Sequence, residues 1–177
     1  MKKVVLFTIF AALMMISSAA VAQTASGNLT VNATVQGSIQ LVFNTDGSGV
    51  ALSSGAGTAN ATLNFGNISA FGALAGNVTR TTTATTFTVS TPVDVLVSAT
   101  NTTSANYKLQ AQLASNPAPN SFTIGGVSVT NTALSANITS TGTYGSNVGF
   151  PVAITVPFSN TTALNISNVI TYTATAN

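Results

Sequence analysis

The chain has 177 residues, of which 45% are hydrophobic and 3% are charged, and its formal net charge is +2. It contains no His, Cys, Trp or Glu, and beyond residue 3 its only charged side chains are those of Asp46, Arg80, Asp94 and Lys108. Acid–base catalysis, covalent catalysis and most metal sites need several titratable or soft-ligand groups held close together, so this composition argues against an enzyme, a cofactor site or a metal site.

Residues 1–22 have the pattern of a secretory signal peptide. Lys2 and Lys3 form a positive n-region, residues 4–16 an apolar h-region, and Ala20-Val21-Ala22 a small-x-small cleavage site. We predict cleavage after Ala22 and a secreted protein at the cell surface, which meets a membrane only during export. Removal of the two lysines leaves a nearly neutral chain without a basic cluster, so nucleic acid is not expected as a partner.

Residues 28–43 alternate between apolar and polar side chains with a period of two, which is the signature of strands with one buried face. Gly37 interrupts the run, and we predict two strands, at about 28–36 and 38–43. The apolar face of the first carries Leu29, Val31, Ala33 and Val35. An unpaired strand of this kind would be prone to aggregation, so it should pair either within its own domain or with another copy.

The remaining chain consists of short alternating segments separated by turn residues, without helical periodicity. Pro92 is expected to end the Thr-rich strand of residues 78–91 or to mark an edge, and Pro151 and Pro157 suggest that the strand 148–158 lies at an edge. This pattern predicts a single all-β domain, an antiparallel immunoglobulin-like β-sandwich. Turns are expected at 44–49, 101–106, 116–120 and 160–162, and further strands at 93–97, 107–113, 122–124, 127–129 and 164–174.

Three features could carry chemistry, but each has a simpler structural interpretation. Asp94 has outward parity in a strand and is expected to be a solvated residue. The spacing of Asn44 and Asp46 resembles the start of a calcium loop, but the later acidic ligands are absent, which favours a plain turn. The Thr-rich run at 81–88 could form an ice-binding or carbohydrate-binding face, although β-propensity alone explains it.

The layout of the mature chain resembles that of bacterial fimbrial subunits and the related spore coat protein U group of secreted pilus proteins. The similarity rests on the alternating N-terminal segment, on Leu63-Asn64-Phe65-Gly66, and on the closing segment Val169-Ile170-Thr171-Tyr172-Thr173. The resemblance implies an incomplete immunoglobulin-like sandwich that is completed by a donor strand from another copy. It also implies a periplasmic chaperone and an outer-membrane usher as partners.

The leading hypothesis is therefore a pilus-like structural subunit that self-associates into oligomers or filaments by strand addition. Its expected parts are a signal peptide at 1–22, an N-terminal extension at 23–36 and a β-sandwich domain at 37–177. One alternative is a small outer-membrane β-barrel, although a terminal aromatic residue and aromatic girdles are missing. Another is a monomeric secreted adhesin or carbohydrate-binding module.

Overall fold

The computed structural model describes residues 26–132, 136–160 and 165–177. The predicted signal peptide, residues 1–22, lies outside these ranges. The chain divides into two compact units, Met1–Thr34 and Val35–Asn177. The second unit contains all the described strands, and we refer to it as the domain. No helix long and apolar enough to cross a bilayer occurs in the described ranges.

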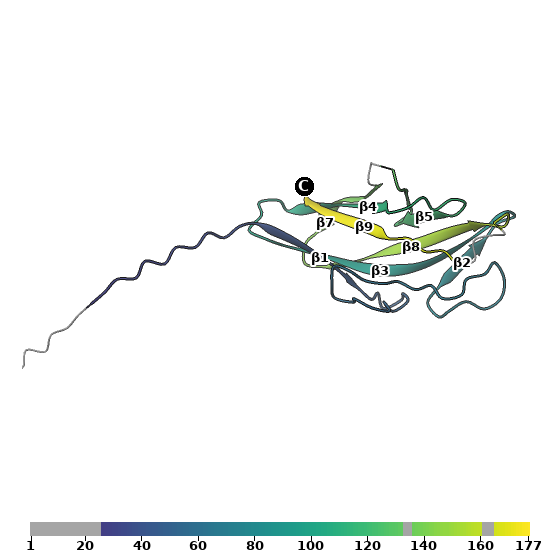
Figure 1. The fold of residues 1–177 in the computed structure, drawn as a ribbon, viewed down its shortest axis with the longest axis horizontal. Coiled ribbons are helices and arrows are strands. Elements are labelled where there is room, and N and C mark those ends of the chain that lie inside the picture. Colours follow the sequence, from purple (N-terminus) through teal and green to yellow (C-terminus); the bar gives the residue numbers. More distant parts are fainter. Residues whose placement is uncertain (1–25, 133–135, 161–164) are drawn as a thin grey trace, which may run out of the picture. The chain divides into compact units, whose positions relative to one another are not determined.

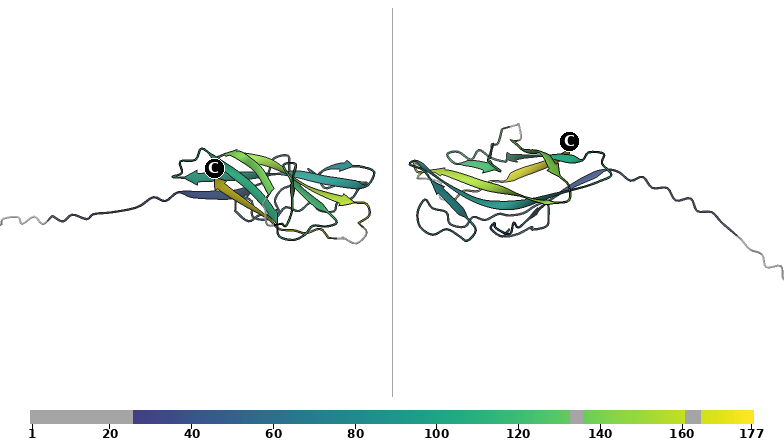
Figure 2. Two further views of the ribbon diagram at one scale, coloured as in Figure 1. Left: turned by 90° about the horizontal axis from the view of Figure 1, so that it is seen from above. Right: turned by 180° about the vertical axis from the view of Figure 1, so that it is seen from behind.

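The domain is an antiparallel immunoglobulin-like β-sandwich, as the sequence predicts. One sheet has six strands in the order β1–β3–β8–β5–β6, with β2 also paired to β3, and the other has the order β7–β4–β9. The two sheets lie face to face (Figures 1 and 2). The strands are β1 (Ser38–Asn44), β2 (Thr79–Thr82), β3 (Thr86–Thr100), β4 (Asn106–Leu113), β5 (Ser121–Ile124), β6 (Val127–Val129), β7 (Ala136–Thr143), β8 (Asn147–Pro157) and β9 (Ile170–Ala176).

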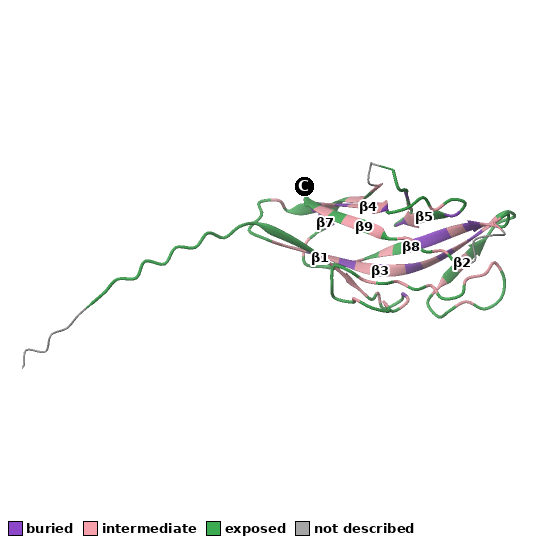
Figure 3. Ribbon diagram, viewed as in Figure 1, coloured by how far each residue is buried: buried purple, intermediate pink, exposed green. Residues whose placement is uncertain are grey.

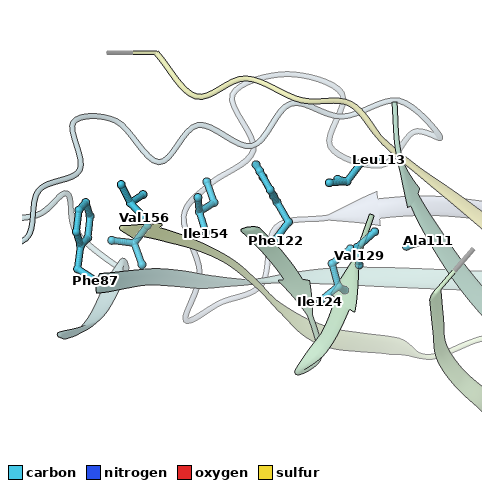
Figure 4. Close-up of a cluster of buried hydrophobic side chains, with 9 residues drawn as sticks. Phe87, Ala111, Leu113, Phe122, Ile124, Val129, Ile154 and Val156 are labelled. Carbon is cyan, nitrogen blue, oxygen red and sulfur yellow. The ribbon is translucent and has the colours of Figure 1, made fainter. Parts of the chain in front are cut away.

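The core lies between the sheets and is built by period-two alternation. Along β3, every second side chain from Phe87 to Val97 is buried (Figure 3), which places the intervening polar residues on the outer face. Leu109 and Ala111 of β4 are fully buried opposite them. Figure 4 shows the larger of two buried clusters, to which β3, β4, β5, β6 and β8 contribute Phe87, Val89, Ala111, Leu113, Phe122, Ile124, Val129, Ile154 and Val156.

The predictions about proline were wrong, because Pro92 does not end a strand and β8 is not an edge strand. β3 continues through Pro92, and β8 lies between β3 and β5. Pro92 and Pro151 face each other in the ladder. The carbonyl of Pro151 accepts a hydrogen bond from the Gly125 N–H, 2.9 Å away on the β5 side, so its ring nitrogen also points away from β3. Neither proline therefore removes a β3–β8 hydrogen bond.

Three other expectations need correction. The strand predicted at 28–36 is not formed: residues 26–37 have no regular secondary structure, since a strand requires a ladder partner. β7 was not predicted, because Ile138 is its only large apolar side chain. The closing strand begins at Ile170 and not near residue 164; residues 161–164 lie outside the described ranges. In addition, the strand predicted at 78–91 is a hairpin of β2 with the start of β3, closed by a 2.8 Å hydrogen bond from the Thr83 N–H to the Thr86 carbonyl, and β3 also contains the strand predicted at 93–97. The strands predicted at 38–43, 107–113 and 148–158 and the Gly125-Gly126 hairpin are confirmed.

Candidate functional site

A large pocket of about 1070 Å³, with apolar and polar walls, lies over the inner face of the six-stranded sheet. The pocket is partly open to solvent, so among the described residues it forms a groove that a further segment of chain could enter. None of the lining residues is charged. The inner face of the six-stranded sheet contributes Phe43, Phe87, Val93, Phe122, Val152, Ile154 and Val156. The rest of the lining comes from Leu52, residues 59–68, residues 165–170 and Tyr172.

Two of the three sequence elements on which the fimbrial resemblance rests lie at this pocket. Leu63 and Phe65 line it from the long connection between β1 and β2, and Ile170 and Tyr172 line it from β9. The rings of Phe43 and Tyr172 meet edge to face with centroids 5.1 Å apart, which brings β1 and β9 together across the two sheets. Burial raises the pKa of Tyr172, so its hydroxyl stays neutral throughout the physiological range.

β9 borders the pocket and forms one edge of the three-stranded sheet. The Asn177 N–H donates to the Asn106 carbonyl, and the Ala114 N–H donates to the Val169 carbonyl. Hydrogen-bonded pairs alternate along an antiparallel ladder, so the odd-numbered residues of β9 direct their backbone groups toward β4. The backbone N–H and C=O groups of the even-numbered residues therefore point to the outer edge, and these residues are Ile170, Tyr172, Ala174 and Ala176.

The predicted self-association residues are exposed in the structure. Leu29 is 88% exposed, Val31 79% and Val35 74%, and Ala33 is exposed as well. Three large apolar side chains at alternate positions are thus left in water, which disfavours the free state. The carbonyl of Val35 accepts a hydrogen bond of 2.8 Å from the Asn101 Nδ2 group.

Asp94 is half-buried and not fully solvated, because Asp46 reaches across the sheet to meet it. A Cβ atom placed on Gly149 would lie 2.7 Å from Oδ2 of Asp46 and 3.3 Å from Oδ1 of Asp94, so both carboxyl groups converge above this glycine. Burial, and then the charge of Asp46, raises the pKa of Asp94. Hydrogen bonds from the hydroxyl and N–H of Ser48 lower the pKa of Asp46.

Asp46 also closes its own turn. Asp46 Oδ1 accepts hydrogen bonds of 2.7 Å from both the N–H and the Oγ of Ser48, which is the arrangement of a capped turn. The described residues contain no group of three or more His, Cys, Asp or Glu side chains placed to hold a metal ion. The other two charged side chains beyond residue 3, Arg80 of β2 and Lys108 of β4, lie in strands away from this pair.

No protein-family model, curated protein or solved structure matches this chain. The resemblance to fimbrial subunits and the spore coat protein U group therefore stays a prediction. Sequence reasoning identified the exposed stripe and the closing strand, but it could not find the pocket. A pocket depends on the separation of segments such as residues 59–68 and 165–170, which no local pattern encodes.

Proposed function

We propose that this protein is a secreted, cell-surface structural subunit that self-associates into a pilus- or fimbria-like filament by β-strand addition. In this proposal residues 29–35, the donor segment, enter the pocket of another copy and pair with the outer edge of β9. The observation that carries the proposal is that one chain combines two features. A large groove with an apolar floor lies beside a strand edge that has no partner among the described residues, and an exposed apolar stripe has strand periodicity.

The dimensions and the parity of the two partners agree. β9 has seven residues, and the donor segment also has seven. In an extended strand Leu29, Val31, Ala33 and Val35 lie on one face, so they can all face the interior of the sandwich while the backbone groups of alternate residues pair with the edge. Complete burial of the three large side chains would contribute roughly 5–8 kcal/mol as an upper estimate.

The open edge also suggests how assembly must be controlled. A subunit whose strand edge and pocket are unoccupied can pair with unrelated chains before it reaches the filament. A periplasmic chaperone that covers the edge, and an outer-membrane usher that exchanges the chaperone for the next subunit, would prevent this, so we include both as proposed partners. The work of the subunit in this proposal is mechanical and adhesive, and it needs no catalytic group.

The proposal can be tested with two complementary variants of the exported chain. Leu29→Asp with Val31→Asp disables the donor segment, whose side chains are exposed before assembly, so folding should be unaffected. Ala174→Pro removes an N–H that points to the outer edge of β9, which blocks pairing while leaving the bonds to β4 intact. Neither variant alone should form filaments, and a mixture should form only one-to-one heterodimers in analytical ultracentrifugation.

A matched control carries the same added charge on the other face of the donor segment. Thr30→Asp with Asn32→Asp should still assemble, since these side chains point away from the pocket in a strand of the predicted parity. Filaments formed by the Leu29→Asp, Val31→Asp variant, or a wild-type chain that stays monomeric at high concentration, would contradict the proposal.

A further inference from the structure

An exposed pair of aromatic side chains lies at the end of the domain where β8 finishes. Phe71 is 76% exposed and Phe158 is 38% exposed, and their ring centroids are 6.2 Å apart. Phe158 also stacks on Phe87 at 6.3 Å, and Phe87 lines the pocket. Phe71 and Phe158, which we call the aromatic patch, are therefore continuous with the pocket through Phe87.

Arg80 holds the loop that presents the patch. Its Nη1 group donates hydrogen bonds of 3.0 Å to the carbonyls of Ser69 and of Gly72, which flank Phe71 in the sequence. One of the few charged side chains of this protein thus fixes the backbone on both sides of an exposed phenylalanine. A large aromatic side chain held in water on a pinned loop is characteristic of an interaction surface.

The connection between the donor segment and its own domain is short and is held by a hydrogen bond. Only Gln36 and Gly37 separate Val35 from β1, so the step from Val35 to Ser38 spans at most about 11 Å. Asn101 holds the carbonyl of Val35 at 2.8 Å. It also lies so close to Gly37 that a Cβ atom there would be 2.7 Å from the Asn101 carbonyl oxygen. A copy that donates its segment must therefore bring its domain close to the end of the acceptor's pocket.

The direction of pairing determines which end of the pocket this is. Every described strand pairing in the domain is antiparallel, and antiparallel pairs are the more stable kind. A donor segment antiparallel to β9 places Val35 opposite Ile170, where β9 begins. In Figure 1 β9 begins near the middle of the domain and runs away from the end at which β8 finishes. The chain that follows Val35 in the donor therefore continues toward that end, which carries the aromatic patch.

We infer that the aromatic patch is the surface on which the domain of the donating copy rests, as a second contact between neighbouring copies beside the added strand. This inference rests on the proposed function. It assigns Phe71 to the contact between domains, whereas the pocket residues contact only the donor segment. The surface of the donating copy that meets the patch is the region around Asn101, where the short connection leaves its domain.

The test compares a peptide with a whole donating copy. The acceptor is the exported chain with Leu29→Asp and Val31→Asp, and it is offered either a peptide of residues 26–37 or the Ala174→Pro copy, which can only donate. Phe71→Ser in the acceptor should weaken binding of the whole copy by about tenfold or more and leave the affinity for the peptide unchanged. Phe71→Tyr, which keeps the ring, should restore most of the loss. Both affinities can be measured by calorimetry.

The outcomes separate this inference from the function on which it rests. If peptide and whole copy bind and Phe71→Ser weakens neither, or weakens both equally, the contact at the aromatic patch is refuted and strand addition stands. If neither the peptide nor the whole copy binds the acceptor that retains Phe71, the proposed function fails and the inference fails with it. Near-ultraviolet circular dichroism of the Phe71→Ser acceptor checks that its fold is retained.

Discussion

At the scale of single residues, the most unusual interaction is the meeting of Asp46 and Asp94 above Gly149. Two carboxylates that converge in this way repel each other unless one of them binds a proton. The Nη1 group of Arg80 donates its hydrogen bonds to backbone carbonyls, and Lys108 lies in the other sheet. Neither side chain therefore neutralises the negative charge of the Asp46–Asp94 pair. The two acids therefore titrate as a coupled unit, with the first proton taken up largely at Asp94.

This coupling predicts a pH-dependent effect of Asp94→Asn. The pKa of Asp94 is raised above its ordinary value of 3.8, so ionisation of this group opposes folding. The penalty is absent below the unfolded pKa and complete above the folded pKa. The variant, which can still donate a hydrogen bond to Asp46, should unfold with a free energy higher by about 0.5 kcal/mol at neutral pH, a small value because water screens the pair. The difference should vanish near pH 3 in urea titrations.

The pKa of Asp46 is shifted in the opposite direction to that of Asp94, so substitution of Asp46 should have the opposite effect on stability. Its pKa is lowered, so its hydrogen bonds with Ser48 support the folded state above the ordinary pKa and are lost as the pH falls. Asp46→Ala should therefore lower stability at neutral pH and have little effect in acid. A stabilising effect of Asp94→Asn that persists unchanged in acid would show that the pair is not coupled as described.

Gly142 is a second residue whose role is visible only in three dimensions. The ring of Tyr107 lies directly against it, and the ring atoms occupy the place where a Cβ atom would be. Gly142→Ala should lower the free energy of unfolding by about 2 kcal/mol, measured by chemical denaturation, because the buried ring cannot move aside. Tyr107→Phe should not rescue this loss, since the ring itself is in the way.

Tyr107→Phe alone should have the reverse effect. The Tyr107 hydroxyl is buried and has no hydrogen-bond partner within the described part of the chain. Removal of an unsatisfied buried hydroxyl should leave stability unchanged or raise it by up to about 1 kcal/mol, which thermal unfolding would show. A marked loss of stability would mean that the hydroxyl is satisfied in solution.

At the scale of the elements, the alternation of backbone direction along β9 makes a sharp prediction. Thr173→Pro removes an N–H that faces β4 and should lower the free energy of unfolding by about 3 kcal/mol, whereas Ala174→Pro removes an N–H at the outer edge and should cost much less. Denaturation midpoints of these two adjacent variants, measured under conditions that prevent assembly, compare them directly. Equal losses of stability would contradict the assignment of odd-numbered backbone groups to β4 and even-numbered ones to the outer edge.

Most strands could be predicted because their apolar period is two and their partners lie within one domain. β3 and β4 bury every second side chain, and this pattern is readable in Val93, Val95 and Val97. The errors arose where a pattern was interpreted without its neighbours. Pro92 and Pro151 are compatible with inner strands because their ring nitrogens point away from each other, and sequence alone does not reveal which pairs are hydrogen-bonded.

At the scale of the whole molecule, the scarcity of charge predicts how assembly responds to salt. The donor segment carries no charged residue, and none lines the pocket. Salt screens interactions between charges and leaves apolar burial largely intact. The rate and extent of filament formation, followed by light scattering, should change by no more than about threefold between low ionic strength and 1 M NaCl. Loss of assembly at high salt would indicate contacts of another kind.

Of the candidate site, the sequence predicts the apolar stripe but not the pocket or the aromatic patch. The stripe of Leu29, Val31 and Val35 is a local pattern, and its prediction as a strand fails within a single copy because no ladder partner is formed. The pocket and the aromatic patch depend on contacts between residues far apart in the chain, such as Phe71 with Phe158. Such contacts leave no periodic signal.

The distribution of the basic residues has a consequence for proteolysis. Trypsin-like proteases cut after Lys or Arg, and beyond residue 3 this chain offers them only the bonds following Arg80 and Lys108. Both bonds lie inside strands that are hydrogen-bonded to neighbours, so local opening must precede any cut. The folded chain should therefore be cut only slowly by proteases of this specificity.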